Sequence, residues 1–454
     1  MRFPVLKLDA EAPPDNYAAA LLLLAVALIW PYSLVGPFQF DDWNVIVESP
    51  AVHSLTAWWQ SMPGIRPLLK FRYALKWQGV ERAAGFHLVN VLIHAANVIL
   101  VWRLLQRWPG LRHSIAWWVA LIFAFHPVQT EAVTYISGRS MALMAFFWLA
   151  AALLWLYHYR RLALVFFVAA LATRETAWSL PFVLLVWQRA QGMPWAKSAR
   201  SLWPLWLGLL GATLLILALP GYQRMLASAL AARDPWSNLA LQVHTLAYLL
   251  LDPVLLLRNN IDPDLPVLAR FDRSWWLGFL TIVGCLVLGG RWLAGRPAVG
   301  LALLWPFLLL VPTNGLIARF DPASERHLYL ALLGPAVLLC LGLTTICQGR
   351  LRVWGLSVVL SFLVVGTLMR IHDYRSESAL WEATSRRSPN KARVWNNLGY
   401  ALLVEGEAAR AKLALSRALV LDPGFMRAQL NLERAEQVLA RSGNTAVTSP
   451  LKDQ

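Results

Sequence analysis

The sequence predicts an all-α protein, namely a polytopic membrane helix bundle followed by a short helical repeat array. Of its 454 residues, 58% are hydrophobic and only 15% are charged, whereas a soluble chain of this size needs a more polar surface. The apolar residues lie in blocks of roughly 15–20 residues, the length that a helix needs to cross a bilayer. The 24 Trp residues fit aromatic belts at two membrane interfaces.

The net charge of +16 favours a membrane over nucleic acid as the partner of this chain. Most of the excess cations lie in short loops between the apolar blocks, where they orient the protein and meet anionic lipid. The three cysteines, Cys285, Cys340 and Cys347, have neither CxxC nor metal-ligand spacing. We therefore expect membrane lipid as a partner, no nucleic acid, no disulfide framework and no metal site.

The basic loops assign the cytoplasmic side of the bundle, because cytoplasmic loops of membrane proteins are enriched in Lys and Arg. About eleven spans fit between these loops. They lie near 17–37, 88–106, 114–127, 140–157, 161–173, 176–190, 202–220, 275–290, 298–312, 328–346 and 351–369. The first block is too long for the hydrophobic region of a signal peptide, and Arg2 and Lys7 place the N-terminus in the cytoplasm.

One further apolar block, 239–257, is long enough to span the membrane but would invert the topology of everything that follows. We therefore expect a re-entrant or interfacial helix on the outer side, broken near Asp252 and Pro253. The remaining outer segments, which collect most of the polar residues, are 38–87, 128–139, 221–274, 313–327, the junction 173–175 and the tail. The chemistry is therefore expected at the outer face.

The membrane domain is predicted to cover residues 1–370, and residues 371–440 have the pattern of a tetratricopeptide repeat. Pro389 and Pro423 lie 34 residues apart, which is the period of this repeat. The small or characteristic residues at the expected offsets are Trp395, Leu398, Gly399, Gly406, Ala411 and Ala418. Such an array usually binds protein or peptide, although a helical hairpin that caps the membrane domain is the alternative. Residues 441–454 are expected to be disordered.

An acidic pair follows the first span in the stretch FQFDDWNVI, residues 38–46. Asp41 and Asp42 are adjacent, and adjacent carboxylates raise each other's pKa. One of them could act as a base toward an acceptor hydroxyl, which is what glycosyl transfer to an alcohol requires. The alternative is a solvated loop start or a helix N-cap.

The stretch HPVQTEAVTYISGR carries His126, Glu131 and Arg139 in one short outer connection. A charged residue at the head of a span is expensive and usually functional. Arg139 suits a lipid-linked phosphate, because a guanidinium binds phosphate through two parallel hydrogen bonds. The alternative for Arg139 is a salt bridge with Glu131.

The stretch TNGLIARFDPASERHLYL carries a second group of charges, Arg319, Glu325 and Arg326, followed by Tyr329. Paired cations on the outer side could bind a polyprenyl phosphate, whereas interfacial anchoring is the alternative. Between two spans, Arg174 and Glu175 are interpreted as an ion pair in the bundle. Arg66 lies in the first outer loop, which is expected to form amphipathic surface helices.

In the stretch FHLVNVLIHAANVI, four polar residues occupy one helix face: His87, Asn90, His94 and Asn97. The two histidines are two helical turns apart, about 10 Å, so they would not share one metal ion. A role in hydrogen bonding between helices and a direct role in substrate binding are both open.

Together these stretches resemble the GT-C glycosyltransferases, specifically the transmembrane-and-tetratricopeptide-repeat O-mannosyltransferases and their bacterial relatives. FDDWNVI, IRPLLKFRYAL, FHPVQTEAVTYISGRSMAL, ATRETAWSLPFVLLV and ERHLYLALLG follow in the order of that family's motifs, and then the repeats. The resemblance covers nearly the whole chain. Arg174 stands where the family usually has Lys, and Met141 where it often has an acid.

This resemblance implies transfer of a monosaccharide, expected to be mannose, from a polyprenyl-phosphate donor to Ser or Thr hydroxyls of proteins. An Asp of the first loop, Asp41 or Asp42, would be the base. Arg139, Arg174, Arg319 and Arg326 would bind the donor phosphate. The expected lining of the substrate pocket is Arg66, His87, His94, His126, Glu131, Glu175, Glu325 and Tyr329. No cofactor is expected to be required, and nothing in the sequence indicates a divalent cation.

Other functions remain as alternatives. A transporter would predict internal repeats and helices broken at mid-membrane depth, and the sequence shows neither. A membrane scaffold that assembles envelope proteins through its repeats predicts no effect from losing Asp41 and Asp42. The acceptor could also be a lipid or glycan, although the repeats favour protein. The Arg-rich composition and short tail favour a bacterial inner membrane, with the site and the repeats on the periplasmic side.

Overall fold

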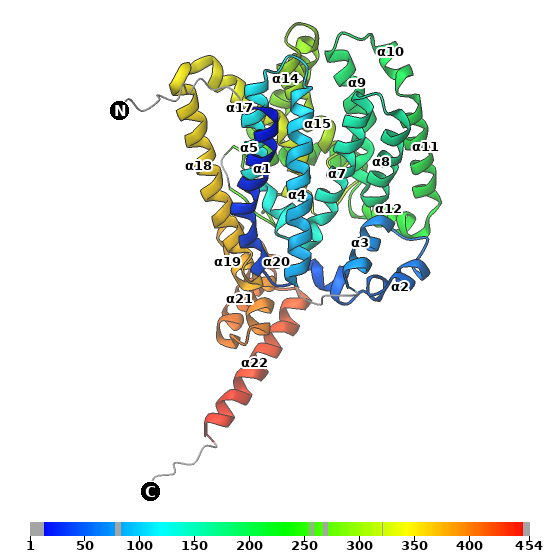
Figure 1. Cartoon of the computed structure of the whole chain (residues 1–454). Coiled ribbons are helices and arrows are strands. Elements are labelled where there is room, and N and C mark those ends of the chain that lie inside the picture. The colour runs from blue at the N-terminus through cyan, green and yellow to red at the C-terminus, as the bar shows by residue number, and fades with distance from the viewer. Residues whose placement is uncertain are drawn as a thin grey trace. The chain divides into compact units, whose positions relative to one another are not determined.

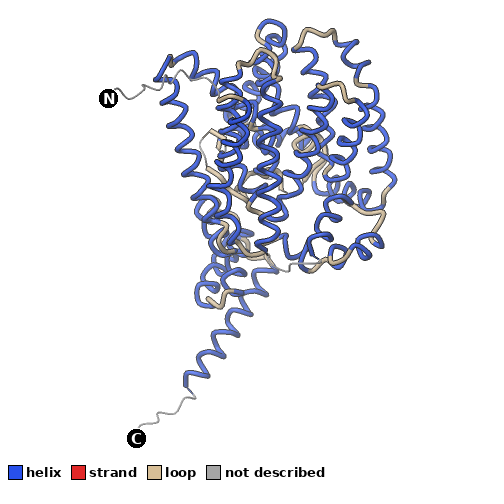
Figure 2. The backbone as a smooth tube through the Cα atoms, in the orientation of Figure 1, coloured by secondary structure: helices blue, strands red, loops and turns tan. Residues whose placement is uncertain are grey.

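The structure is a computed structural model that describes residues 13–77, 83–252, 254–255, 258–266, 271–319 and 321–447. Within these residues it is helical and contains no strand, which confirms the predicted all-α class (Figure 2). The chain divides into two compact units. Unit 1 comprises Met1–Asn259 and Pro266–Ile371, and unit 2 comprises Asn260–Leu265 and His372–Gln454.

Unit 1 is a bundle of helices that overlap the predicted spans one by one (Figure 1). These helices are α1 (Asp15–Ile29), α4 (Ala83–Gln106), α5 (His113–Phe125), α7 (Arg139–Leu156), α8 (Arg160–Thr173), α9 (Ser179–Ala190), α11 (Trp203–Ala218), α14 (Arg273–Gly295), α15 (Pro297–Leu310), α17 (Leu333–Ile346) and α18 (Gly349–Asp373). Among the described residues, five helices are long and apolar enough to cross a membrane, or up to seven if two bent pairs count as one span each. These helices fit an integral membrane protein, and the number of eleven crossings stays a prediction.

Shorter elements connect the long helices. They are η1 (Trp30–Val35), η2 (Trp43–Val47), η3 (Pro50–Val52), α2 (Leu55–Gln60), α3 (Pro67–Trp77), η4 (Pro127–Gln129), α6 (Thr130–Val133), η5 (Ile136–Gly138), η6 (Glu175–Trp178), α10 (Trp195–Ser201), α12 (Pro220–Ala232), α13 (Pro235–Leu251), η7 (Glu325–His327) and α16 (Leu328–Ala331). In Figure 1, α2, α3 and α12 lie at one end of unit 1 and α10 lies at the other.

The segments predicted to lie outside the membrane are bonded to one another. Segment 38–87 is hydrogen-bonded to 128–139, and 128–139 is hydrogen-bonded to 313–327. The junction at 173–175 is bonded to both 38–87 and 221–274. Because these contacts join every predicted outer segment of unit 1, the polar connections gather at a single end of the bundle.

Helix α13 covers most of the block 239–257, and it ends at Leu251, while Pro253 lies outside the described residues. Near its start, Asn238 donates to the carbonyl of Gly315 at 2.6 Å. Three residues after its end, the carbonyl of Val254 accepts from His126 at 3.0 Å. Both contacts are to predicted outer segments or their edges, which favours the re-entrant or interfacial helix over a full crossing.

The core of the bundle contains a cluster of tryptophans. The sequence analysis had assigned the tryptophans to aromatic belts at the two membrane interfaces. Trp108, Trp148, Trp187 and Trp305 are buried, with ring centroids 4.8–6.3 Å apart along the cluster. Such edge-to-face and tilted contacts add stabilisation beyond the buried area of each ring. Part of the tryptophan content therefore serves packing between α7, α9 and α15 and not an aromatic belt.

Unit 2 contains four consecutive helices, α19 (Glu377–Arg387), α20 (Ala392–Val404), α21 (Ala408–Leu421) and α22 (Met426–Val447). At Gly399 of α20, a Cβ atom would lie 2.5 Å from the side chain of Leu415, so α21 packs against bare backbone. Ala411 and Ala418 of α21 are fully buried. These are the small residues expected at the helix contacts of a repeat, although the repeat assignment itself stays a prediction.

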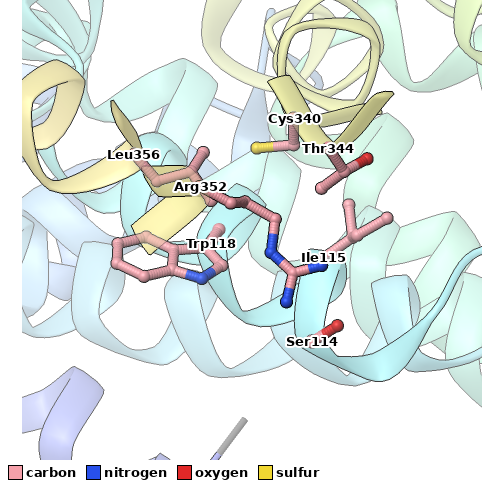
Figure 3. Close-up of a pocket in the computed structure, with 7 residues that line it drawn as sticks. All are labelled: Ser114, Ile115, Trp118, Cys340, Thr344, Arg352 and Leu356. Carbon is pink, nitrogen blue, oxygen red and sulfur yellow. The ribbon is translucent and has the colours of Figure 1, made fainter. Parts of the chain in front are cut away.

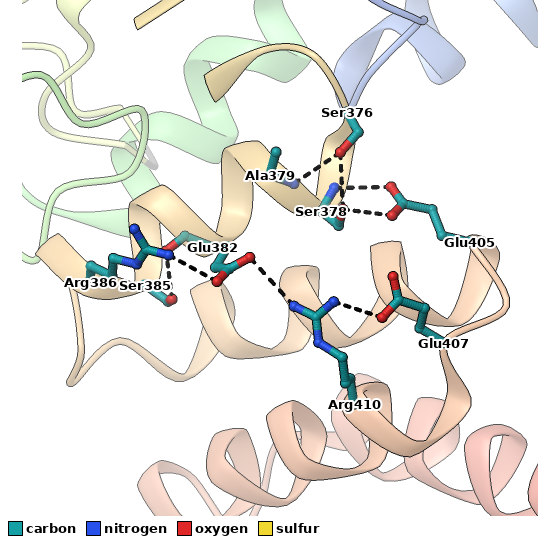
Figure 4. Close-up of polar contacts among 9 residues, drawn as sticks. All are labelled: Ser376, Ser378, Ala379, Glu382, Ser385, Arg386, Glu405, Glu407 and Arg410. Carbon is teal, nitrogen blue, oxygen red and sulfur yellow. Dashed lines mark hydrogen bonds and ion pairs between the residues drawn. The ribbon is translucent and has the colours of Figure 1, made fainter. Parts of the chain in front are cut away.

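Polar contacts add to this packing at the surface of unit 2 (Figure 4). Arg410 of α21 is within 3.4 Å of Glu382 on α19 and 2.6 Å of Glu407, while Glu405 accepts from Ser378 at 2.6 Å. Helix α22 continues to Val447, into the first part of the predicted disordered tail, and residues 448–454 lie outside the described residues.

Unit 2 also includes the short segment Asn260–Leu265, which the predicted domain boundary had placed in the membrane domain. The carboxylate of Asp262 is bound by Lys391 at 2.6 Å and by Arg393. Ser388 donates to the carbonyl of Asp262 at 2.9 Å and accepts from Asn260 at 2.8 Å. The segment is therefore held by an ionic clamp at the start of α20.

We expect Asp262→Asn to loosen this segment, because the exchange removes the charge that two cations share. Loss of charge-assisted hydrogen bonds of this kind costs about 1–3 kcal/mol. Hydrogen exchange of the full chain in detergent should show faster exchange in 260–265 and in the first turn of α20. Asp264→Asn is the matched control, because Asp264 is exposed and forms no hydrogen bond or ion pair among the described residues. Equal exchange in the two variants would contradict the clamp.

Candidate active site at one end of the bundle

Asp42 anchors the first outer loop to the turn η5. Its carboxylate accepts three hydrogen bonds: one from the backbone N–H of Gln39 at 3.0 Å, and two from Ser137, from the N–H at 2.7 Å and the hydroxyl at 2.5 Å. The turn that presents Ser137 requires glycine at the next position, since a Cβ on Gly138 would lie 1.9 Å from the carbonyl oxygen of Glu131. Asp42 is therefore a fixed structural contact.

The pKa of Asp42 is raised from 3.8 to about 7. Burial is the largest cause, since it disfavours the charged carboxylate. The hydrogen bonds from Ser137 and Gln39 oppose this effect, and the neighbouring charge of Asp41 makes only a small addition. The sequence predicted a raised pKa from adjacency of the two acids, but desolvation is the dominant cause.

Asp41 has a different environment from Asp42. It is half-buried, whereas only 1% of the surface of Asp42 is exposed. The backbone N–H of Asp41 donates to the hydroxyl of Tyr135 at 2.9 Å, which ties the acidic pair to the segment before η5. The two adjacent acids are thus not equivalent: Asp42 is enclosed, and Asp41 lies at the boundary of the loop.

Four arginines converge on His327: Arg66, Arg174, Arg319 and Arg326 all lie close enough to act on it electrostatically. They come from the first outer loop, the α8–α9 junction and the 313–327 connection. Burial, and then the charges of Arg326 and Arg66, lower the pKa of Arg319 to about 10. The site is therefore strongly electropositive.

Two hydrogen-bond donors in this cluster are buried without a partner. Arg174 donates to the hydroxyl of Ser140 at 2.5 Å and to Nε2 of His327 at 3.1 Å. Since Nε2 of His327 accepts this bond, Nδ1 carries the ring proton. Nδ1 of His327 and Nε of Arg174 both lack a partner in the described part of the chain. Each of these N–H groups can donate one further hydrogen bond.

Glu175 joins three elements of the outer end. Arg66 donates to it through Nε at 3.0 Å and through the terminal nitrogen at 2.9 Å, and the hydroxyl of Tyr222 donates at 3.1 Å. Burial alone would raise the pKa of Glu175, but the charge and hydrogen bonds of Arg66 lower it to about 2. Arg174 and Glu175 act on each other electrostatically, but the ion pair that the described residues form with Glu175 is with Arg66.

Glu131 holds the 313–327 connection against η4 and α6. Its carboxylate accepts from the hydroxyl of Ser324 at 2.8 Å and from the backbone N–H of Arg326 at 3.0 Å, and the Arg326 side chain lies within 3.4 Å. Glu131 therefore pairs with Arg326 and not with Arg139. The pairing fixes the position of Arg326 in the cation cluster.

Arg139 lies inside the bundle, next to the acidic pair. It is fully buried, donates to Asn90 at 2.5 Å and to the carbonyl of Phe86 at 2.7 Å, and its guanidinium lies 5.1 Å from the ring centre of Tyr73. Its charge acts on Asp42 and Tyr73, and it is absent from the groups acting on His327. Arg139 thus stabilises the first outer loop from its position inside the bundle.

The polar face of α4 bonds to its neighbours within the bundle. His94 accepts from the hydroxyl of Tyr329 at 2.7 Å, and Asn97 donates to the same oxygen at 3.0 Å. His87 donates to the carbonyl of Gly36 at 2.9 Å. All of these side chains are buried. The contacts favour the hydrogen-bonding role for this face over direct contact with substrate.

Two further predicted site residues are also enclosed. His126 bonds to the carbonyl of Val254 at 3.0 Å and accepts from the N–H of Val128 at 3.2 Å. Glu325 accepts from Asn259 at 3.0 Å and is buried. Neither belongs to the electropositive cluster.

The sequence analysis did not select several uncharged residues that complete the site. They are Tyr73, Tyr135, Ser137, Ser140, Tyr222, Ser324 and His327. Asp41, Asp42 and Arg326 all act electrostatically on Tyr135, so this ring lies between the acids and the cations. All but Tyr222 stand in the quoted stretches, which is the signal that could have found them. In the part of the chain that the structure describes, no three His, Cys, Asp or Glu side chains are grouped to hold a metal ion.

The fold and this site fit a helical membrane protein with an acid pair and a cluster of arginines at one end. No family model matches the chain. The chain is 25% identical to the protein O-mannosyl-transferase TMTC3 of Mus musculus over 96% of its own length, covering 54% of the mouse protein. It is 25% identical to a protein O-mannosyl-transferase of Caenorhabditis elegans, covering 89% of this chain and 63% of the worm protein.

A third relative, the protein O-mannosyl-transferase Tmtc3 of Drosophila melanogaster, is 26% identical over 90% of the chain and 53% of the fly protein. These similarities confirm the resemblance to the transmembrane-and-tetratricopeptide-repeat O-mannosyltransferases. The chain spans between about half and two thirds of the length of these relatives.

The pKa of Asp42 predicts a pH-dependent stability. The pKa of Asp42 in the folded state is above its value in the unfolded state, so the folded state holds the proton more tightly. The free energy of unfolding therefore falls as the pH rises from about 4 to about 7, and it no longer changes through this group above pH 7. The shift corresponds to about 4 kcal/mol at most. We expect Asp42→Asn to abolish this slope in thermal unfolding measured across that range. Ser137→Ala should extend the slope to higher pH, since it removes a bond that lowers the pKa. An unchanged slope in Asp42→Asn would refute the assignment.

The bidentate pair of Arg66 and Glu175 should be energetically coupled. A double-mutant cycle with Arg66→Met and Glu175→Gln is expected to give about 1–3 kcal/mol, measured by unfolding in detergent. Arg103 and Asp15 form the comparison pair, at 3.2 Å but with side chains 40% and 60% exposed. That pair should couple by less than about 1 kcal/mol. Similar coupling in both cycles would show that the outer pair is an ordinary surface contact.

Proposed function

We propose that this chain is a glycosyltransferase that moves mannose from a polyprenyl-phosphate donor to Ser or Thr hydroxyls of proteins at the outer face of the membrane. The observation that carries the proposal is the electropositive cluster around His327, with its two unpartnered donors, beside the acidic pair. The names of the three relatives support mannose as the sugar and protein as the acceptor.

In this proposal the donor phosphate binds the cluster. Nε–H of Arg174 and Nδ1–H of His327 are unpartnered donors, and a phosphate oxygen would satisfy them. Arg66, Arg319 and Arg326 supply further positive charge. Arginine charge of this kind can stabilise a leaving phosphate without a nucleotide sugar, and the proposal includes no cofactor. Arg139 has no place in this phosphate site, because its contacts are on the acidic side.

Asp41 is the proposed base. It takes the proton of the acceptor hydroxyl while the hydroxyl oxygen attacks C1 of the sugar. The bond from C1 to the phosphate oxygen breaks on the opposite face, so the configuration at C1 inverts and polyprenyl phosphate leaves. Asp42 acts as a positioning residue in this scheme, because three donors already occupy its oxygens and it is enclosed.

The remaining parts of the proposal concern the architecture of the bundle, the selection of the acceptor and the membrane in which the chain resides. A GT-C architecture with the donor lipid in the outer leaflet would place the reacting phosphate at the end of the bundle where the cluster lies. Unit 2, as a repeat array, would select the protein acceptor. The chain would reside in a bacterial inner membrane with the site and unit 2 on the periplasmic side.

The test is transfer of labelled mannose from polyprenyl-phosphate mannose to an envelope protein extract by the purified full chain. We expect Asp41→Asn to lower the rate by about 10²–10⁴-fold, as loss of a general base does. Asp42→Asn should retain measurable activity with a changed pH profile. Thermal unfolding of both variants checks that they are folded. Equal labelling by the wild type and by Asp41→Asn would remove Asp41 as base, and labelling of lipid or glycan alone would replace the protein acceptor.

A further inference from the structure

The connection 313–327, which carries two arginines of the cation cluster, is fastened to helix α13 by side-chain amides. Asn314 donates from Nδ2 to the side-chain oxygen of Gln242 on α13 at 2.8 Å. One helical turn before Gln242, Asn238 donates to the carbonyl of Gly315 at 2.6 Å. All three amides are buried, with at most 4% of each side chain exposed. Because a buried amide is costly without its partners, these bonds constrain the two elements that they join.

Asn314 also closes a loop within this connection. Its Nδ2 donates a second hydrogen bond, to the carbonyl of Pro322 at 3.1 Å. The chain turns tightly just after Asn314, because a Cβ on Gly315 would lie 2.6 Å from the carbonyl oxygen of Val311. One amide group thus joins the two ends of the loop to each other and joins the loop to α13.

Arg319 lies within this loop, and its position depends on the loop backbone. It is half-buried, and its side chain forms no hydrogen bond or ion pair in the part of the chain that the structure describes. Its charge nevertheless acts on His327, and it is repelled by Arg326. The other three arginines of the cluster each bind a side chain directly. Arg319 is therefore the member of the cluster that needs a fixed backbone.

Side-chain bonds of this kind are not general where helices of the bundle meet. Figure 3 shows seven side chains at the meeting of α5, α17 and α18. Among the described residues these seven form a single side-chain hydrogen bond, from Thr344 to the carbonyl of Leu341 at 2.8 Å, and this bond stays within α17. The amide bonds between α13 and the connection 313–327 are thus a local feature of the end that carries the cation cluster.

We propose that Asn314 and Gln242 are positioning residues that hold Arg319 in place for the donor phosphate. This inference rests on the proposed function, in which a polyprenyl phosphate binds the cation cluster. Neither amide touches the substrate. When the amide bonds are lost, Arg319 keeps its charge but its guanidinium occupies more positions, so the phosphate is held less well. The acceptor side of the site does not depend on this loop.

The test compares the kinetics of Gln242→Leu and Gln188→Leu in the purified full chain. Gln188 is the matched control, since it is a buried glutamine on α9 that accepts from Ser201 at 2.9 Å, close to α10. In Figure 1, α10 lies at the other end of unit 1 from α2, α3 and α12. Labelled mannose is transferred from polyprenyl-phosphate mannose to the envelope protein extract, and the concentration of each is varied in turn.

Gln242→Leu should raise the KM for polyprenyl-phosphate mannose about fivefold, the effect of losing one hydrogen bond. The apparent KM for the extract should not change, and Gln188→Leu should change neither constant. Asn314→Leu should raise the KM for the donor further, to about tenfold, because it removes the bonds to both Gln242 and Pro322. A lower kcat with an unchanged KM for the donor would indicate loss of folded protein and would overturn the positioning role.

Hydrogen exchange of residues 315–322 separates failure of this inference from failure of the proposed function, because it needs no substrate. Exchange there should be faster in Gln242→Leu than in Gln188→Leu. Equal exchange in the two variants would show that the amide bonds do not hold the loop, and the positioning role would be overturned. No transfer by the wild type, with the loop still released by Gln242→Leu, would instead remove the proposed function and the phosphate donor with it.

Discussion

The bond between the carboxylate of Asp42 and Ser137 is the contact on which the outer end of the bundle depends. It joins the first outer loop to a turn that starts α7, and that turn is possible only because Gly138 allows the backbone to approach Glu131. Through Glu131, the same turn holds the connection that carries Arg326. A single short stretch thus sets the distance between the acidic pair and the cations. Loops joined in this way can hold reacting groups in place without a rigid sheet beneath them.

The cation cluster is the second constraint, because its charges do not cancel. Four arginines act on His327, and the printed ion pairs join only Arg66 to Glu175 and Arg326 to Glu131. Unpaired charge in a partly buried site is expensive unless a bound group compensates it. The unpartnered N–H groups of Arg174 and His327 point to the same missing component. Hydrogen bonds from Tyr222 and Ser324 to the two glutamates add to the contacts that fix these carboxylates. In the proposed function, the donor phosphate is the group that would compensate the charge of the cluster.

The sequence predicted the helical blocks well, because a run of apolar residues in a membrane chain can satisfy its backbone only as a helix. It also located the polar connections that form the site. It did not predict partners. Glu131 and Arg139 stand eight residues apart, yet one binds Arg326 and the other binds Asn90, since the turn at η5 directs them to opposite sides. Nor did spacing show that 260–265 packs within unit 2, because that contact depends on Lys391 and Arg393, which lie far along the chain. Charge identifies candidate residues, whereas burial and long-range contacts decide which of them can meet a substrate.

The two adjacent acids show how such a decision is made. A base must offer a free lone pair to the proton that it removes. Asp42 accepts three hydrogen bonds and only 1% of its surface is exposed, so an acceptor hydroxyl has little access to it. Asp41 is half-buried, and its backbone N–H donates to the hydroxyl of Tyr135. The two acids therefore differ in position: Asp42 is enclosed and secures the loop, whereas Asp41 lies at the boundary, where the proposed base would have to meet the acceptor.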